Sequence, residues 1–527
     1  MTQAGRRAER RTGWRAAWAV YLATSIGVWS AVAVAVADES LSGGERPNIV
    51  LFLVDDMGLM DTSVAFLTDA AGKPQRYPLN DFYRTPAMER LAERGVRFSN
   101  FYAMSVCSPT RTSIQTGQNS ARHHVTNWIN PRSNNRGPLG APEWRWRGLD
   151  RKSTTLARLL QKSGYRTLHV GKGHFGPEET DGADPTTIGF DVNVGGRSVG
   201  QPGSYYGKQN YGAGGKRSPN AVPHLEAYHG TDTFLTEALT FEANRLMGDS
   251  LEQRRPFFLY LAHYAVHAPF ESDARFAAHY RDSGKPPAAQ AFATLIEGMD
   301  KSLGDLLDFL EARGAAENTL VLFLGDNGSD APLGGPHDVG SSAPLRGRKG
   351  SHFEGGMRVP MIAAWAKPNA NARCQQRLPI ASGLVRREIA AVYDLFPTIL
   401  NAAGVEAPSD HAVDGVDLSP LLASAAGSRP ESTFLMHYPH APHRSDYFTV
   451  YREGRWKLVL HYEPASEPWT PRYELYDLET DPFESRNAAA DHPEQVDRLA
   501  AAMRERLQAQ EAQFPVDKQG QELVPIP

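Results

Sequence analysis

Two pairs of neighbouring polar residues, Asp55-Asp56 and Asp326-Asn327, could together hold a metal ion. Each pair follows a short apolar run that is typical of a buried strand, in residues 48–56 and 319–329. Three carboxylates and one amide oxygen form a hard donor set that suits Ca²⁺ or Mg²⁺ better than zinc. A single pair of this kind more often forms a turn, but adjacent carboxylates that end two strands repel each other unless a cation lies between them. We therefore predict a divalent-cation site.

Several basic side chains could reach the same place. Lys172 and His174 follow one apolar run, His267 ends another, and Lys349 lies in a glycine-rich loop that permits close backbone approach to a ligand. Any one of them alone is more often a solvated or hydrogen-bonded structural residue. Two lysines and Arg111 around a cation, however, form a site for a tetrahedral oxyanion.

Cysteine is almost absent from this chain of 527 residues, which has only Cys107 and Cys374. Two cysteines in an oxidising compartment often pair, so one interpretation is a disulfide between them. The other is that Cys107, in the stretch SVCSPTRTSIQTG at 105–117, is reserved for chemistry while Cys374 stands alone. The two residues by themselves leave both interpretations open.

The elements that must position these residues alternate between strands and helices. Apolar, β-rich runs end in polar residues, and helical patterns such as TPAMERLAERG, TTLARLLQKSG and AFATLIEGMDKSLGDLLDFLEARG lie between them. This alternation predicts an α/β fold with a large, mostly parallel sheet covered by helices on both faces. Ligands of such sheets bind outside the carboxyl ends of the strands, where the polar residues fall.

A different pattern begins near residue 430. Two alternating strands in 447–462 surround Glu453-Gly454, a hairpin signal, and an amphipathic helix at roughly 492–512 follows. We predict a catalytic domain at 45–430 and a smaller C-terminal α+β subdomain at 431–515, built on an antiparallel sheet. A chain of this length is too long for one compact core, which agrees with two units.

The N-terminus has the features of an export signal. Five arginines precede an uncharged run at 16–37, which ends in Ala35-Val36-Ala37. We predict a signal peptide at 1–37 that is cleaved before Asp38, with an uncleaved membrane anchor as the alternative because the run is long. A periplasmic or secreted protein with no stable membrane association after cleavage is the consequence. The net charge of −4 and the lack of a basic stripe argue against nucleic-acid binding.

The ordered motifs resemble those of the type I sulfatases, which belong to the alkaline-phosphatase-like superfamily. The resemblance extends over nearly the whole mature chain, and an ordered set of motifs is far more specific than any one of them. The matching segments are DD at 55–56, CSPTR at 107–111 with TG at 116–117, GYRTLHVGKGH at 164–174, DNG at 326–328, GRKGSHFEGG at 347–356, and RWKLV and ELYDLETDP near the C-terminus.

The resemblance implies that a formylglycine-generating maturation enzyme converts Cys107 to Cα-formylglycine, whose hydrate is the nucleophile. A geminal diol can attack sulfur with one hydroxyl, and the second hydroxyl then collapses to the aldehyde and expels sulfate. The cation is usually Ca²⁺ in this family, with Mg²⁺ possible, and it lowers the pKa of the attacking hydroxyl. The metal ligands implied are Asp55, Asp56, Cys107 as formylglycine, Asp326 and Asn327.

The resemblance to the sulfatase family also implies catalytic roles for residues of this chain. Arg111 would hold the formylglycine and the metal carboxylates, and Lys172 and Lys349 would grip the sulfate oxygens. His174 would act as the base in the collapse step, and His267 would protonate the leaving alcohol. The chain departs from the family pattern at Ile114 and Gln115, where two apolar residues are usual, and at Gly173, where a large residue is usual. Gly173 is expected to leave room beside His174.

We therefore predict hydrolysis of a sulfate ester, with a sulfated carbohydrate favoured over an aryl sulfate because the protein is expected to be exported. The alternatives are a phosphonate monoester or phosphate diester hydrolase of the same superfamily, and a non-catalytic anion- or glycan-binding protein. The segments 127–137 and 141–150 carry Trp and Arg residues that suit sulfated sugars, although ordinary surface loops are an equally good interpretation. The only N-glycosylation sequon overlaps Asn327, which favours a bacterial protein over a lysosomal one.

Overall fold

The computed structural model describes residues 46–335, 339–429, 433–462 and 472–525. The predicted signal peptide at 1–37 lies outside these residues. Within the described part of the chain, no helix combines the length and the apolar character that crossing a bilayer requires. Cys107 and Cys374 are both free and buried, so they do not form the disulfide that the sequence left open.

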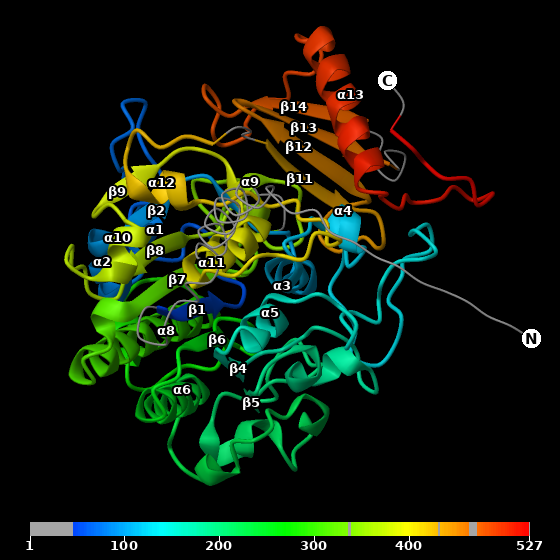
Figure 1. The fold of residues 1–527 in the computed structure, drawn as a ribbon. Helices are drawn as coiled ribbons and strands as arrows, with labels where there is room; N and C mark the ends of the chain where they lie inside the picture. The colour runs from blue at the N-terminus through cyan, green and yellow to red at the C-terminus, as the bar shows by residue number, and fades with distance from the viewer. Residues whose placement is uncertain (1–45, 336–338, 430–432, 463–471, 526–527) are drawn as a thin grey trace, which may run out of the picture. The chain divides into compact units, whose positions relative to one another are not determined.

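An eight-stranded sheet in the order β5-β4-β6-β1-β7-β8-β2-β9 is the largest sheet of the described residues (Figure 1). β8 runs antiparallel to both of its neighbours, and the other pairings are parallel. The predicted mostly parallel sheet is thus confirmed. Its strands are β1 (Asn48–Val54), β2 (Val96–Phe98), β4 (Arg166–Gly171), β5 (Val192–Val194), β6 (Phe257–His263), β7 (Thr319–Gly325), β8 (Met361–Trp365) and β9 (Leu384–Arg386).

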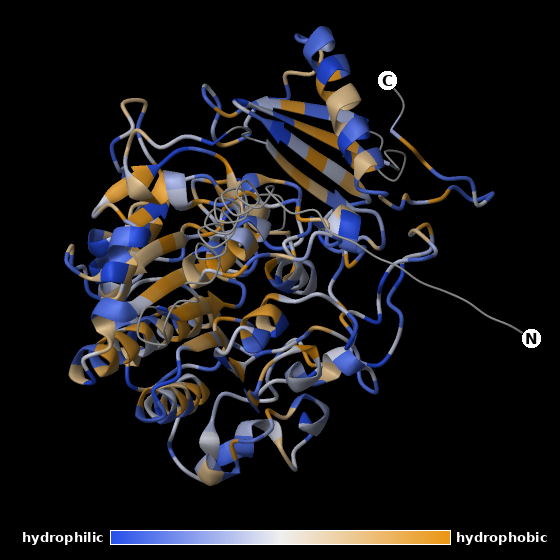
Figure 2. Ribbon diagram, viewed as in Figure 1, coloured by the Kyte–Doolittle hydropathy of each residue, from blue (hydrophilic) through white to orange (hydrophobic). Residues whose placement is uncertain are grey.

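Helices cover both faces of this sheet, and its strands are coloured mostly as hydrophobic in Figure 2. Along β1, Ile49 and Leu51 belong to one hydrophobic cluster, whereas Val50 and Phe52 belong to the other. The first cluster includes residues of α3 (Cys107–Thr116), α5 (Leu156–Lys162) and α11 (Leu395–Ala403), and the second includes residues of α2 (Pro86–Arg94), α6 (Leu235–Glu252) and α8 (Pro287–Ala312). The short elements are α1 (Pro78–Phe82), β3 (Phe101–Tyr102), α4 (Ser120–His123), α7 (Ala277–Tyr280), α9 (Glu354–Met357), α10 (Arg373–Arg377), β10 (Ala390–Ala391) and α12 (Ser419–Ala423).

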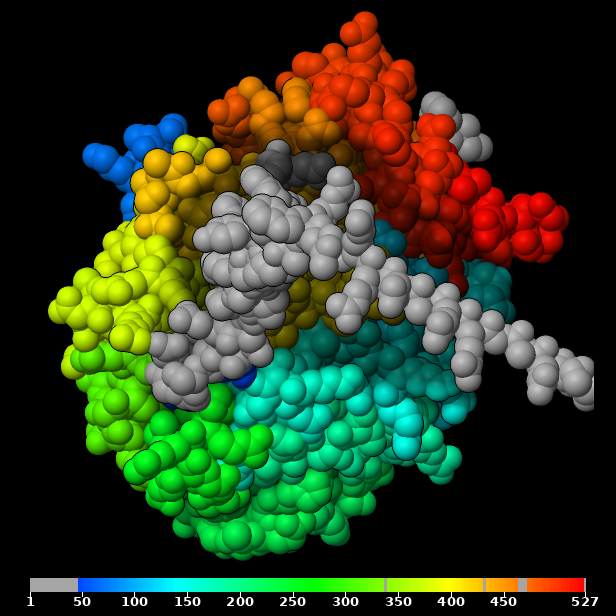
Figure 3. Space-filling model, in the orientation of Figure 1, coloured from blue at the N-terminus to red at the C-terminus, as the bar shows by residue number. Residues whose placement is uncertain are grey.

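The C-terminal part forms a four-stranded antiparallel sheet with one long helix, as predicted. The strands are β11 (Thr433–Tyr438), β12 (Phe448–Glu453), β13 (Trp456–His461) and β14 (Tyr473–Asp477), in that order. α13 (Pro493–Ala509) packs on this sheet through Leu499, Met503 and Leu507. In the space-filling view the orange and red residues of this unit adjoin the yellow residues before them in the chain (Figure 3).

Candidate active site

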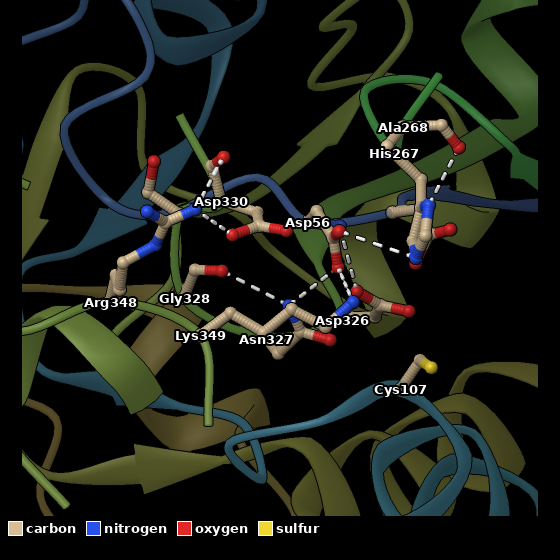
Figure 4. A network of polar contacts seen from close by, with 12 residues as sticks. Asp56, Cys107, His267, Ala268, Asp326, Asn327, Gly328, Asp330, Arg348 and Lys349 are labelled. Atoms are coloured by element: carbon tan, nitrogen blue, oxygen red, sulfur yellow. Dashed lines mark hydrogen bonds and ion pairs between the residues drawn. The ribbon is translucent and has the colours of Figure 1, made fainter. Parts of the chain in front are cut away.

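Four neighbouring parallel strands, β4, β6, β1 and β7, bring the predicted site residues to one edge of the sheet. Asp55-Asp56 follows β1, Asp326-Asn327 follows β7, Lys172 follows β4, and His267 lies four residues beyond β6. The carboxyl ends of parallel strands meet at one edge, and the residues that follow β1 and β7 approach each other there, as Figure 4 shows. Asp56 N–H, for example, donates to Oδ1 of Asp326 at 3.1 Å.

Cys107 is the first residue of α3, and the extended backbone of Val106 ends the preceding segment. The thiol is buried, and its Sγ lies 3.3 Å from Nδ1 of His174. Arg111 lies one helical turn further along α3, so both side chains leave the helix on the same side. The partial positive charge at the N-terminus of α3 favours negative charge that develops on residue 107.

The proton of His174 is placed by a backbone carbonyl. Nε2 of His174 lies 2.7 Å from the Ile129 oxygen, which can only accept, so Nε2 carries the hydrogen. In the neutral ring, Nδ1 therefore presents a lone pair to residue 107. Burial, together with the charge of Lys172, lowers the pKa of His174 well below its usual value and keeps the ring neutral. The ring is thus arranged to accept a proton from the side chain at position 107.

Arg111 is fully buried and holds Asp326 in place. Its Nε and Nη2 donate to Oδ2 of Asp326 at 2.9 and 2.8 Å, and Nη1 donates to the Lys172 carbonyl at 2.9 Å. Burial alone would lower the pKa of Arg111, but Asp326 together with the other acidic groups around it, Asp55 among them, raises that pKa. The guanidinium remains charged and ties α3 to the end of β7.

Both lysines contact carboxylates of the predicted metal site. Lys172 Nζ lies 2.7 Å from each oxygen of Asp55, and Lys349 Nζ lies 2.6 Å from Oδ1 of Asp56. Burial raises the pKa of Asp55 well above its usual value. Burial would do the same to Asp56, but Lys349, His267 and Lys172 lower its pKa instead.

The donor atoms fit a hard divalent cation. Asp56 Oδ2 and Asn327 Oδ1 are buried and, among the described residues, lack a hydrogen-bond partner. Asn327 Nδ2 donates to Oδ1 of Asp56 at 2.9 Å, which sets the orientation of the amide. One ligand atom from each of Asp55, Cys107 and Asp326 lies within 4.8 Å of the others. Unpaired buried oxygens are costly, and a cation among them would remove that cost.

His267 lies beside this cluster. Its Nδ1 donates to the Ala268 carbonyl at 2.9 Å, and its Nε2 lies 3.6 Å from Oδ2 of Asp56 (Figure 4). A proton that His267 gives to a ligand must therefore leave from Nε2. Burial lowers the pKa of His267 to about 4, although Asp56 acts in the opposite direction.

A cavity of about 490 Å³ opens onto these groups. Trp128 and Arg132 line it, so the predicted substrate-facing segment 127–137 does reach the cavity. The second such segment, 141–150, contributes nothing to the lining, and Trp144 within it is buried, with its Nε1 donating to Asn134 at 2.8 Å. The lining comprises Cys107, Trp128, Asn130, Pro131, Arg132, His174, Gly200, Gln201, Asn220, His267, Ala268, Asp330, Lys349, His443 and Arg444.

Sequence reasoning missed five polar residues of the cavity: Gln201, Asn220, Asp330, His443 and Arg444. Arg444 Nη1 lies 2.5 Å from Oδ1 of Asp330, so the start of the C-terminal unit contributes to the cavity wall. Asp330 lies only three residues beyond Asn327, which was a usable signal. Nothing in the spacing of His443 and Arg444 indicated their place.

The expectation that Gly173 leaves room beside His174 is wrong. A β-carbon at position 173 would lie 3.0 Å from the Arg197 carbonyl oxygen and 3.4 Å from Cγ of Pro185. The segment around Arg197 fills the space beside Gly173. It is held there by the His174 N–H, which donates to the Arg197 oxygen at 2.9 Å. Ile114 and Gln115 are buried in α3, where Gln115 Oε1 accepts from the Ala157 N–H at 3.3 Å.

Two protein-family models match the chain. The model described as "Sulfatase" matches residues 47–405, and the model described as "N-sulphoglucosamine sulphohydrolase, C-terminal" matches residues 349–513. The two matches overlap at residues 349–405 and together extend from β1 to α13.

Curated relatives and solved structures agree with these matches. The chain is 29% identical to the N-acetylgalactosamine-6-sulfatase of Mus musculus over 452 residues, covering 83% of this chain and 75% of the relative. It is 31% identical to the arylsulfatase A of Bos taurus over 506 residues, covering 90% and 89%. The solved structure of Ps i-CgsB superposes with a TM-score of 0.68 at 23% identity, covering 89% of this chain and 95% of that one. The phosphonate monoester hydrolase of Agrobacterium radiobacter shares the fold, with a TM-score of 0.57 at 19% identity and coverage of 88% and 95%.

Proposed function

This chain belongs to the sulfatase family, and we propose that it hydrolyses a sulfate ester of a carbohydrate with a nucleophile made from Cys107. Members of this family are sulfuric ester hydrolases, and the name of the mouse relative, N-acetylgalactosamine-6-sulfatase, favours a sulfated sugar. The observation that carries the proposal is the position of Cys107, whose Sγ lies beside His174 Nδ1 and within 4.8 Å of ligand atoms of Asp55 and Asp326.

Conversion of Cys107 to formylglycine by a maturation enzyme would supply an aldehyde hydrate that attacks the sulfur atom. His174 suits the step that releases sulfate, because its Nδ1 lone pair faces residue 107 and takes up the proton of the remaining hydroxyl. Water regenerates the hydrate, so the net reaction is ester plus water giving alcohol plus sulfate. The Ile129 carbonyl prevents the ring from presenting Nε2–H to the nucleophile instead.

The charges of the site are suited to a sulfate group once a cation is present. When all three carboxylates are ionised, Asp55, Asp56 and Asp326 contribute three negative charges, and Arg111, Lys172 and Lys349 contribute three positive charges, so these six side chains then sum to zero. We propose that Asp55, Asp56, Asp326 and Asn327, with residue 107, hold Ca²⁺ or Mg²⁺, which supplies Lewis-acid activation. The sum is then +2, which favours an anionic ester.

The two lysines are proposed to change partners when the site is loaded. Each now neutralises one carboxylate, at 2.7 Å for Lys172 and 2.6 Å for Lys349. A cation on those carboxylates would free both ammonium groups for the sulfate oxygens, and Lys349 already lines the cavity. His267 is proposed to protonate the leaving alcohol from Nε2, since its Nδ1 hydrogen is engaged by Ala268. Burial disfavours the protonated ring, and we propose that the negative charge of a bound ester favours the protonated form that this step needs.

Activity measurements test this proposal. The full chain, co-expressed with a formylglycine-generating enzyme, should hydrolyse nitrophenyl sulfate and at least one member of a panel of sulfated mono- and oligosaccharides. Mass spectrometry of the tryptic peptide that contains residue 107 should show loss of the thiol. Cys107→Ala should abolish turnover while leaving the circular dichroism spectrum unchanged.

Two outcomes would replace the proposal with one of the alternatives. Faster hydrolysis of a phosphonate monoester or a phosphate diester than of every sulfate ester would assign the chain to the related hydrolases that share the fold. An unmodified thiol with no turnover of any ester would indicate an anion- or glycan-binding protein. We further propose that the chain is exported and cleaved before Asp38, which N-terminal sequencing of the mature protein tests.

A further inference from the structure

A second cluster of ligand atoms lies at the edge of the C-terminal sheet, apart from the carboxylate site. His461 ends β13, Glu474 lies in the neighbouring strand β14, and His352 lies three residues beyond Lys349 in the glycine-rich loop. One ligand atom from each of the three lies within 4.8 Å of the others. Both histidines are buried, at 3% and 2% exposure, and the carboxylate is largely buried.

Two distances in this cluster are close to the separation of neighbouring ligand atoms around a metal ion. Nε2 of His352 lies 3.3 Å from Oε2 of Glu474, and Nε2 of His461 lies 3.6 Å from Oε1 of Glu474. Tetrahedral zinc with bonds of about 2.0–2.1 Å separates its ligand atoms by about 3.3 Å. Two imidazoles and one carboxylate also form a set that binds transition metals, unlike the all-oxygen set around Asp55.

In each histidine of the cluster, Nδ1, the ring nitrogen that does not face Glu474, already has a hydrogen-bond partner. Nδ1 of His461 donates to Asp446, with distances of 2.8 and 3.0 Å to the two oxygens, and Nδ1 of His352 is hydrogen-bonded to Ser445 Oγ at 2.7 Å. Metal-bound histidines typically have such a partner, which fixes the ring and its tautomer. Nε2 of His461 is buried without a hydrogen-bond partner among the described residues, and it faces Glu474.

We propose that His352, His461 and Glu474 form a second metal site that binds one Zn²⁺, with Asp446 and Ser445 orienting the two rings. The fourth position is left for water. The site would fasten the loop that carries Lys349 to the segment that contributes His443 and Arg444 to the cavity, and so hold two walls of the cavity together. This proposal does not depend on the reaction that the protein catalyses.

A metal-binding measurement distinguishes this site from the alternative, in which His461 is protonated and forms ion pairs with Asp446 and Glu474. The full chain, kept in millimolar Ca²⁺ to fill the carboxylate site, is titrated with Zn²⁺, and bound zinc is measured by mass spectrometry after dialysis. Co²⁺ is used as a spectroscopic probe, because a four- or five-coordinate complex has intense visible d–d absorption. The wild type should retain one equivalent of zinc and show this absorption.

The variants locate the metal. Glu474→Gln keeps the side-chain shape and should weaken zinc binding by more than about 100-fold, and His461→Ala should do the same. Asp446→Asn, which removes only the orienting partner, should weaken it by about 10- to 100-fold. His437→Gln is the matched control, because His437 is buried in the same sheet but its two nitrogens contact Thr449 Oγ1 and the Gln513 carbonyl, each at 2.7 Å.

The proposal is overturned if the wild type binds no zinc at micromolar concentration. It is also overturned if Glu474→Gln, with a wild-type circular dichroism spectrum, binds zinc as tightly as the His437→Gln control. Loss of zinc in Glu474→Gln and retention in the control would support it, even if His461→Ala failed to fold.

Discussion

The backbone of Gly200 packs against the imidazole ring of His174. A β-carbon at position 200 would lie 2.8 Å from Cε1 and 3.2 Å from Nδ1 of that ring, and contacts below 3.0 Å require one of the partners to move. Nδ1 is the atom that faces Cys107 at 3.3 Å. The lack of a side chain at position 200 therefore allows the ring of His174, the proposed proton acceptor, to occupy this position.

Gly200→Ala should impair catalysis while leaving the fold intact. The added methyl group would displace the ring of His174 by several tenths of an ångström, and we expect kcat/KM on nitrophenyl sulfate to fall by about 10- to 100-fold. Gly215→Ala is the matched control, because a β-carbon at position 215 would lie 3.7 Å from the Gly212 oxygen, which is an ordinary van der Waals contact. Equal activity of the two variants would show that the ring position does not matter.

His174→Ala should lower kcat by about 10²- to 10⁴-fold, the range expected when a proton-transfer group is removed. KM should change much less, because the anionic group of the substrate is attracted by Arg111, Lys172 and Lys349 rather than by a neutral imidazole. Steady-state kinetics test this, with mass spectrometry confirming that residue 107 is modified as in the wild type. A variant with unchanged kcat and raised KM would assign His174 to substrate binding instead.

Removal of divalent cations should abolish turnover reversibly. Without a cation, Lys172 and Lys349 stay on Asp55 and Asp56, as their contacts of 2.7 and 2.6 Å show, and the six charged groups sum to zero. Dialysis against a chelator should therefore remove activity, and Ca²⁺ or Mg²⁺ should restore it. Asp326→Asn should raise the cation concentration needed for half-maximal activity. Full activity after exhaustive chelation would contradict the proposed role of the carboxylates.

The sequence was sufficient to predict which strands end at the site, because that follows from chain-local patterns. The apolar runs before Asp55 and Asp326 predicted buried strands, and parallel strands place their carboxyl ends together. The large sheet, its helical covering and the antiparallel C-terminal sheet were predicted on the same basis.

Non-local contacts could not be predicted in this way. The pairing of Lys172 with Asp55 depends on how two loops pack, and Arg444 reaches Asp330 from more than a hundred residues away. The tight packing at Gly173 was misjudged because its neighbour, Arg197, comes from a segment without any motif. The His352, His461 and Glu474 cluster was missed because its members come from three segments that only the folded chain brings together.

Lys457→Met should destabilise the protein strongly. Lys457 is buried in β13 and its Nζ lies 3.1 Å from Glu354 Oε1 and 2.6 Å from Glu484 Oε1, so it joins the C-terminal sheet to α9. Removal of one member of a buried ionic cluster leaves uncompensated charge, at a cost of about 3–5 kcal/mol in the free energy of unfolding. Urea unfolding measures the loss.

The double variant Lys457→Met/Glu484→Gln is the control for this prediction. Burial already raises the pKa of Glu484 to about 7, so its carboxylate depends on the lysine. Removing that charge together with the lysine should recover part of the lost stability. A double variant no more stable than the single one would show that packing of the Lys457 stem, rather than charge, is responsible.

Stability should fall with rising pH because of Asp61, a fully buried residue in the loop after β1. Burial raises its pKa to about 7, although the Gly58 N–H donates to its Oδ2 at 2.9 Å. In the unfolded chain an aspartate has a pKa near 3.9, so between about pH 4 and pH 7 the folded state binds one more proton than the unfolded state. The free energy of unfolding then decreases with pH by up to about 1.4 kcal/mol per unit in that window and levels off above it.

Asp61→Asn removes this dependence, because an amide of the same shape does not ionise. The free energy of unfolding of the variant minus that of the wild type should therefore increase by about 3 kcal/mol between pH 5 and pH 8. This change does not depend on which of the two proteins is more stable at either pH. Urea unfolding at both pH values, followed by circular dichroism, measures the two differences. All other groups titrate in the same way in the two proteins. A stability difference that is the same at both pH values would therefore mean that Asp61 has the same proton affinity in the folded and the unfolded chain. Hydrogen bonds would then fully compensate for its burial.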